Sequence, residues 1–113
     1  MNLRSQYLKN MAFEIIIKPL ARIDLDEAIL WYENELGGLG NKFYQAFLTA
    51  SETVSKYPEA FMEISPGIRR IIIKRFPYKL FYASSENKIF IIGIIHAKRS
   101  AGFITSHLNE GLK

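Results

Sequence analysis

The longest apolar run in the chain, Ile89–Ile95, constrains the fold more than any other segment. Its seven residues fall far short of the roughly 20 that a helix needs to span a bilayer. An apolar run of this length without polar alternation is typical of a strand that is buried on both faces. The segment Lys88–His96 is therefore predicted to be the central strand of a sheet.

Three other segments have strand-like sequences. Phe13–Ile17 is apolar and β-branched and stops before a lysine–proline pair, which favours a short strand. Ile68–Arg75 reads as a strand with charged ends, and Tyr78–Ala83 alternates its side chains between two faces. Phe76-Pro77 separates these two strands, because proline lacks the N–H that a strand ladder needs. Ser84–Asn87 is predicted to be a hairpin loop, so the last three strands should be antiparallel.

Two amphipathic helices are predicted between the first strand and the other three. Apolar residues recur at three- and four-residue steps across Leu20–Leu36 and again across Leu39–Tyr57. Gly37–Gly40 ends the first helix, since glycine tolerates the left-handed conformation of a helix cap. This glycine-rich turn lacks the lysine and serine or threonine that follow in a phosphate loop. An antiparallel helical hairpin is therefore the favoured interpretation.

The order of strand, two helices and three strands predicts an α+β fold. The antiparallel two-helix hairpin should pack on one face of a mainly antiparallel four-stranded sheet, because nothing else in the chain can cover that face. Residues 58–67 are predicted to form a loop, and residues 103–112 a short tail with at most a turn of helix. With 113 residues and 49% hydrophobic residues, the chain suits one domain. We assign it to residues 11–113, after a flexible extension at residues 1–10.

The composition excludes several classes of protein. The chain has no cysteine, which excludes a disulfide scaffold, a Cys-ligated zinc site and a thiol nucleophile. The first ten residues contain no apolar stretch of the kind found in signal peptides, so a soluble cytoplasmic protein without a membrane partner is expected. Met11 is an alternative start of translation, because the first predicted strand follows it closely.

Charge divides the sequence into an acidic first part and a basic second part. Residues 1–67 carry six basic and nine acidic side chains, a net charge of −3, whereas residues 68–113 carry nine basic and two acidic ones, a net charge of +7. This segregation predicts a surface for an anionic partner. The alternative is a solvated sheet face whose charges protect its edges, and the sequence leaves both open. The basic candidates on the strands or at their ends are Arg69, Arg70, Lys74, Arg75, Lys79, Lys98 and Arg99.

The histidines and the helical side chains are weaker candidates. His96 ends the central strand three residues before Arg99, so it is either a proton-transfer residue or a structural one. His107 is predicted to lie exposed in the tail. Neither histidine has further ligands at metal-binding spacing, so no metal and no cofactor are expected. The carboxylates of the first helix are predicted to be solvated, and the aromatic residues of both helices to pack in the core or between the helices.

Several short stretches carry a resemblance that spans about Phe13 to Arg99. The most specific ones lie in the basic part of the chain: Ile68-Arg69-Arg70, Arg75-Phe76-Pro77-Tyr78-Lys79-Leu80-Phe81-Tyr82 and Ile94-Ile95-His96-Ala97-Lys98-Arg99. Supporting stretches are Ile17-Lys18-Pro19-Leu20-Ala21, Asp24-Leu25-Asp26-Glu27-Ala28, Trp31-Tyr32-Glu33, Gly38-Leu39-Gly40 and Tyr57-Pro58. In this order and spacing, they resemble the RelE/ParE superfamily of bacterial toxins from type II toxin–antitoxin systems.

The resemblance implies a RelE/ParE-like toxin domain that arrests growth in the cytoplasm and is neutralised by a cognate antitoxin. The ParE branch inhibits DNA gyrase and needs no nuclease site. The Phe76-Pro77-Tyr78 turn and the His96-x-x-Arg99 ending favour this branch, although Ser100-Ala101 replaces the Asp-Pro that often follows the arginine. On this interpretation the basic candidates bind the target or the antitoxin.

The RelE branch is the alternative, and its members cleave messenger RNA on the ribosome. Here Arg70, Lys79 and Arg99 would stabilise the phosphate and His96 would move a proton. Two departures weaken this interpretation: Ile72 stands where a second lysine is expected, and no tyrosine follows Arg99. A third hypothesis is a degenerate toxin that binds only its antitoxin.

Overall fold

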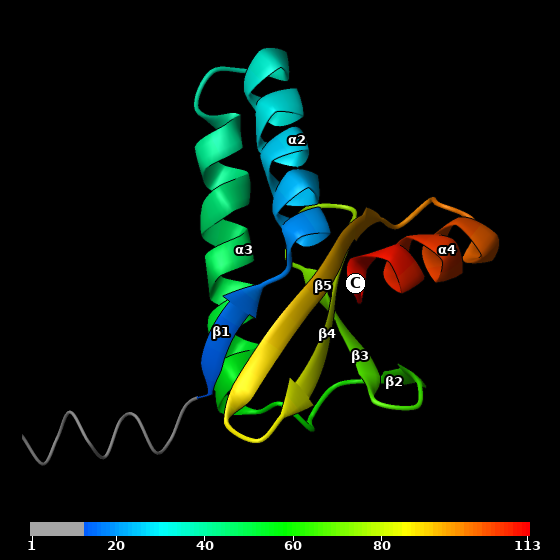
Figure 1. Cartoon of the computed structure of the whole chain (residues 1–113). Coiled ribbons are helices and arrows are strands. Elements are labelled where there is room, and N and C mark those ends of the chain that lie inside the picture. The colour runs from blue at the N-terminus through cyan, green and yellow to red at the C-terminus, as the bar shows by residue number, and fades with distance from the viewer. Residues whose placement is uncertain (1–12) are drawn as a thin grey trace, which may run out of the picture.

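A central strand with neighbours on both sides organises the fold. The computed structural model describes residues 13–113, in which five strands follow the order β1-β5-β4-β3-β2 (Figure 1). Their bounds are β1 (Glu14–Ile17), β2 (Glu63–Ser65), β3 (Ile68–Ile73), β4 (Tyr78–Ser85) and β5 (Lys88–His96). β1 pairs with β5 in parallel, and the other neighbours are antiparallel. The central position predicted for β5 is confirmed, whereas the predicted N-terminal extension and Met11 lie outside the described residues.

Two long helices form the predicted hairpin on one face of the sheet. α2 (Pro19–Glu35) begins with a proline, which suits a helix start because the first N–H groups have no partner within the helix. Gly38, with a φ of 91°, leads into α3 (Leu39–Lys56). The Glu33 carboxylate accepts the N–H groups of Gly38 and Gly40 at 3.0 Å, so a negative charge sits at the positive end of α3. None of the helices within residues 13–113 is long and apolar enough to cross a membrane.

The main core lies between this hairpin and the sheet. Its fully buried side chains include Phe43, Phe47 and Val54 of α3 and Ile73, Leu80, Tyr82, Ile89 and Ile91 of the sheet. Tyr32 stacks on Phe43 at a centroid distance of 5.3 Å, which joins the two helices. The prediction that helical aromatics pack in the core therefore holds for these side chains. It is wrong for Trp31 and Tyr57, which are 56% and 62% exposed.

The sheet has five strands rather than the four predicted. The extra strand, β2, lies in the segment 58–67 that was expected to be a loop. It pairs with β3 only at Glu63↔Arg69 and Ser65↔Ile68, across a turn in which Gly67 has a φ of 79°. Three exposed residues are too few to show the alternation that identifies a strand in a sequence.

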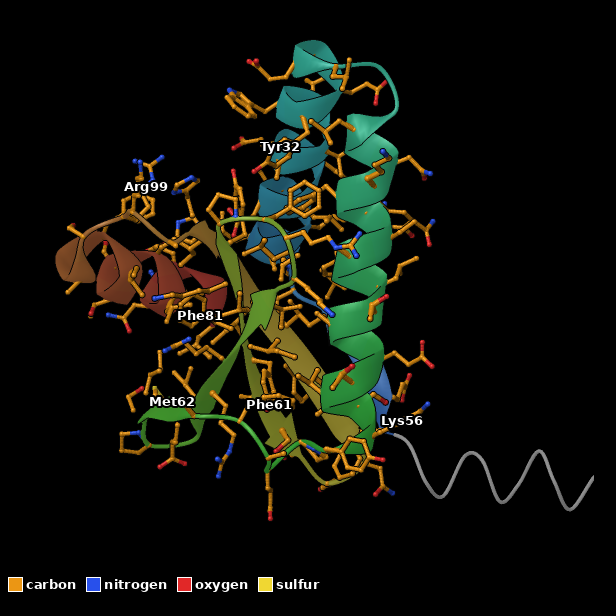
Figure 2. All side chains as sticks on the ribbon, turned by 180° about the vertical axis from the view of Figure 1, so that it is seen from behind. Tyr32, Lys56, Phe61, Met62, Phe81 and Arg99 are labelled. Carbon is orange, nitrogen blue, oxygen red and sulfur yellow. The ribbon has the colours of Figure 1, made fainter. Side chains whose placement is uncertain are left out.

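The C-terminal tail forms a helix of three turns instead of the short turn expected. α4 (Ala101–Gly111) follows Ser100, whose hydroxyl accepts the N–H of Phe103 at 3.1 Å as an N-cap. Leu108, 5% exposed, packs with Phe81, Ile92 and Ile95. This second core lies on the sheet face away from the hairpin (Figure 2). The expectation that helices cover only one face is therefore wrong.

A β-bulge adjusts β5 to these two cores. The pairing with β4 shifts between Phe81↔Gly93 and Tyr82↔Ile91, which inserts an extra residue into β5. Ile91 and Ile94 therefore both pack toward the hairpin although they are three positions apart. Gly111, the last residue of α4, lies directly against the bulge, because a β-carbon on it would overlap the carbonyl oxygen of Ile92.

Tyr82 makes the main core sensitive to high pH. Its buried hydroxyl donates to the carbonyl of Pro58 at 2.7 Å, and burial raises its pKa from 10.0 to about 12. The unfolded tyrosine ionises near pH 10 while the folded one keeps its proton. Between pH 10 and 12 the free energy of unfolding should thus fall by about 2 kcal/mol. Urea titrations should show that Tyr82→Phe, although less stable near pH 8, lacks this part of the alkaline decline. An unchanged decline would contradict the assignment.

Candidate functional site

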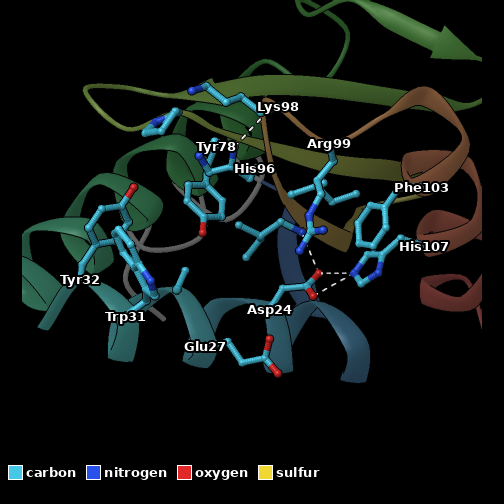
Figure 3. A pocket seen from close by; sticks show the side chains of 14 residues that line it. Asp24, Glu27, Trp31, Tyr32, Tyr78, His96, Lys98, Arg99, Phe103 and His107 are labelled. Carbon is cyan, nitrogen blue, oxygen red and sulfur yellow. Dashed lines mark hydrogen bonds and ion pairs between the residues drawn. The ribbon is translucent and has the colours of Figure 1, made fainter. Parts of the chain in front are cut away.

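A cleft of about 780 Å³ opens between α2 and α4 at the end of β5 (Figure 3). Its polar and aromatic walls come from three parts of the chain that are far apart in sequence. They are Asp24, Glu27 and Trp31 of α2, Tyr78, His96, Lys98 and Arg99 at the ends of β4 and β5, and Phe103 and His107 of α4. The fold therefore assembles this cleft only when α4 is docked.

Asp24 links the three walls of the cleft. Its carboxylate accepts the backbone N–H of Ile94 at 3.0 Å and lies 2.8 and 2.9 Å from Nε2 of His107. β1 ends at Ile17, which pairs with Ile91, so the following residues of β5 have no strand partner on that side among the described residues. The Asp24 carboxylate accepts the Ile94 N–H there in place of a strand carbonyl. The two side chains are only 10% and 19% exposed, which corrects the predictions of a solvated Asp24 and an exposed His107. Across residues 13–113, no three acidic or histidine side chains gather as metal ligands.

The basic end of the cleft consists of His96, Lys98 and Arg99, and stacked side chains fix the orientation of Arg99 there. The guanidinium of Arg99 lies 4.4 Å from the ring centroid of Phe103, and Phe103 stacks on His107 at 5.2 Å. Such a cation–π contact fixes the planar group while leaving its N–H donors available. Arg99 is thus oriented through α4, although it lies outside that helix.

His96 presents a hydrogen-bond donor to the cleft. Its Nδ1 accepts the backbone N–H of Lys98 at 3.1 Å, so a neutral His96 carries its proton on Nε2. Tyr78, its partner on β4, packs edge-on against the imidazole at 5.2 Å. Burial raises the pKa of Tyr78, and the nearby Arg99 opposes this rise. The Tyr78 hydroxyl therefore stays protonated at neutral pH.

The sequence-based ribonuclease residues do not share one face of the sheet. Arg70 and Lys79 pair with Phe81 and Ile72, so both lie on the face that α4 partly covers. His96 pairs with Tyr78, whose ring packs toward the hairpin. Strand alternation thus separates the proposed proton-transfer residue from Arg70 and Lys79.

The other basic candidates are spread over different places. Arg69 faces the hairpin side, where its guanidinium donates to the carbonyl of Phe61 at 2.7 Å and pairs with Glu63 at 3.7 Å. Lys74 and Arg75 follow β3 and line a separate groove beside α3. Only Lys98, Arg99 and His96 are brought together in the cleft.

The second hollow, which we call the α3–β3 groove, encloses about 960 Å³. Lys42, Lys74 and Arg75 lie at its rim. β2 covers only the first part of β3, so the outer edge at Ile71–Ile73 has no strand partner in the described chain. The groove thus combines an open sheet edge with a largely apolar lining. That lining includes Leu39, Ala46, Ala50, Ile71, Ile72 and Phe76.

Comparisons with known proteins agree with this architecture. A family model described as "ParE toxin of type II toxin-antitoxin system, parDE" matches residues 15–101, and the match ends where α4 begins. A solved structure, "Chromosomal ParDE TA system from P. aeruginosa", is similar with a TM-score of 0.68 and 18% identity over 78% of this chain and 99% of that chain. At this identity the likeness shows the fold. No curated protein matches the chain.

Proposed function

This chain belongs to the ParE toxin family of type II toxin–antitoxin systems, and from that premise we propose that it arrests growth by inhibiting DNA gyrase. A cognate antitoxin neutralises it, and both act in the cytoplasm. The family match over residues 15–101 carries this proposal. The protein then acts by binding its target and needs no cofactor.

The arrangement of the basic side chains favours binding over ribonuclease chemistry. General acid–base catalysis needs the proton-transfer group within hydrogen-bond reach of the reacting atoms. His96 and the pair Arg70 and Lys79 lie on opposite faces of the sheet. Ile72, where the RelE branch is expected to carry a lysine, is 59% exposed and supplies no charge.

The α3–β3 groove supports antitoxin binding. An extended segment can add a strand to the open edge at Ile71–Ile73 and place alternate apolar side chains in the groove. Lys42, Lys74 and Arg75 at the rim complement acidic residues. We therefore infer that an acidic segment of the antitoxin occupies this groove.

Target inhibition is tested by expressing the chain alone and by assaying the purified protein. Induced cells should stop growing and induce DNA-damage signalling, and the purified protein should block supercoiling by gyrase. Transcripts on translating ribosomes should remain intact. Site-specific transcript cleavage without an effect on supercoiling would support the RelE alternative instead, and normal growth would support a degenerate toxin.

Charge reversal at the groove rim tests the antitoxin site. Lys74→Glu should weaken antitoxin binding about tenfold or more, because it places a like charge against the acidic segment. Lys88→Glu is the matched control, since this lysine is also exposed but lies at the far end of β5. Calorimetric titration with the antitoxin compares the two variants. Equal affinities would contradict the assignment of this groove.

A further inference from the structure

We propose that the cleft between α2 and α4 binds a segment of the toxin's target that places one carboxylate at Lys98 and Arg99 and an apolar side chain against Trp31. The inference rests on the proposed toxin activity but not on the identity of the target. It separates target binding in this cleft from antitoxin binding in the α3–β3 groove. One molecule would then present two binding sites on different parts of its surface.

The polar groups of the cleft select a ligand that accepts hydrogen bonds. Within residues 13–113, neither Lys98 nor Arg99 pairs with a carboxylate, so both keep their donors available. Nε2 of His96 adds a further donor beside them. By contrast, the Asp24 carboxylate is already engaged by Ile94 and His107. The end of the cleft at β5 therefore offers several donors to one incoming carboxylate.

Trp31 gives the cleft an apolar anchor point. Its side chain is 56% exposed, yet the ring of the buried Tyr32 supports it edge-on at a centroid distance of 5.1 Å. A large aromatic ring that is already held in place loses little conformational freedom on binding. Tryptophan and arginine are also the side chains most enriched among residues that dominate interface energies. Trp31 and Arg99 are therefore the expected main contributors to binding.

The acidic wall of the cleft favours a protein segment over a nucleic acid. Glu27 lies on α2 beside Asp24, opposite the basic end (Figure 3). A sugar–phosphate backbone running through the cleft would bring repeated negative charges against these two carboxylates. A peptide can instead place a single carboxylate at Arg99 and uncharged atoms along α2.

The wall formed by α4 lies outside the family match. Phe103 and His107 follow the last matched residue, Ala101, yet they line the cleft and orient Arg99. The shape of this site thus depends on a segment that the family model does not include. We infer that α4 sets which target segment fits.

The experiment compares growth arrest by cleft variants with their neutralisation by antitoxin. Arg99→Ala and Trp31→Ala should each weaken target inhibition about tenfold or more while antitoxin binding stays unchanged. Leu30→Ala is the matched control, because this side chain is 61% exposed on the same helix but does not line the cleft. Circular dichroism and urea unfolding show whether each variant is folded. Folded cleft variants that arrest growth like the unmodified protein would overturn the inference.

A direct titration tests the cleft even if the chain arrests no growth. The chain contains one tryptophan, so Trp31 fluorescence reports on this site alone. A short synthetic peptide of leucine and serine with a single aspartate should change the emission, and Arg99→Ala should abolish the change. The same peptide with asparagine in place of aspartate should have no effect. An equal response to both peptides, or a response only to oligothymidylate, would overturn the proposed ligand class. Absence of growth arrest alone would instead refute the proposed function.

Discussion

Gly111→Ala should detach the end of α4 from the sheet and destabilise the protein by about 3 kcal/mol. The new β-carbon would overlap the carbonyl oxygen of Ile92, which belongs to the backbone of the β5 bulge and cannot rotate away. Relief requires the last turn of α4 to move, and Leu108 then leaves the second core. The free energy of unfolding in urea measures the loss, and limited proteolysis should show early cleavage within α4.

Gly102→Ala is the control on the same helix. No atom lies within 4 Å of the position that its β-carbon would take. Alanine is the better helix former, so this variant should be unchanged or more stable by up to about 1 kcal/mol. If the two glycine variants lose equal stability, the contact between Gly111 and Ile92 is not the cause.

Asp24→Ala should cost about 3 kcal/mol of folding free energy. The change removes the acceptor of the Ile94 N–H and leaves His107 without its partner, both in surroundings from which water is largely excluded. α4 should also loosen, because His107 is its polar link to α2. Urea unfolding measures the stability, and amide hydrogen exchange should report faster opening of α4 than of α3.

Two companion variants separate this effect from a general loss of charge on α2. Asp26→Ala removes an exposed carboxylate whose pair with Arg22 has side chains that are 65% and 63% exposed, so it should change stability by less than about 0.5 kcal/mol. Asp24→Asn keeps an oxygen for the Ile94 N–H and should fall between the two. Equal stabilities of the two alanine variants would contradict the role assigned to Asp24.

The elements whose apolar residues recur at a regular spacing were predictable from the sequence. The helical hairpin follows from two long stripes at helical spacing with glycines between them. The central position of β5 follows from its unbroken apolar run, since only a strand with neighbours on both sides buries such a run. In both cases the local pattern and the tertiary packing favour the same structure.

The second core was not predicted, because several residues of α4 have low helix propensity. Gly102, the hydroxyl residues and Asn109 are weak helix formers, so the helix depends on its contact with β5. The Asp24–His107 pair spans 83 positions, and no spacing rule connects them. One signal was present: Asp24 interrupts the face of α2 that carries the buried Ala21, Leu25 and Ala28. An acid in such a face is expected to have a buried partner.

The basic part of the chain shows a limit of reading charge from sequence. Its net charge of +7 suggested one surface, but strand alternation and strand ends distribute the side chains over several places. Arg69 supports a loop, Lys74 and Arg75 line the α3–β3 groove, and Lys98 and Arg99 lie in the cleft. Counting charges therefore predicts a sign for the partner, but not the number of places over which the basic side chains are spread.

The parallel pairing of β1 with β5 determines when the protein can fold during its synthesis. β1 is the first element of the described chain, yet the strand beside it is the last one to be made. The sheet therefore cannot join β1 to β4 until residues 88–96 have left the ribosome. The cleft at the end of β5 is incomplete before that moment, because β5 and α4 supply part of its walls. Binding in this cleft therefore requires that the chain has been made at least as far as His107.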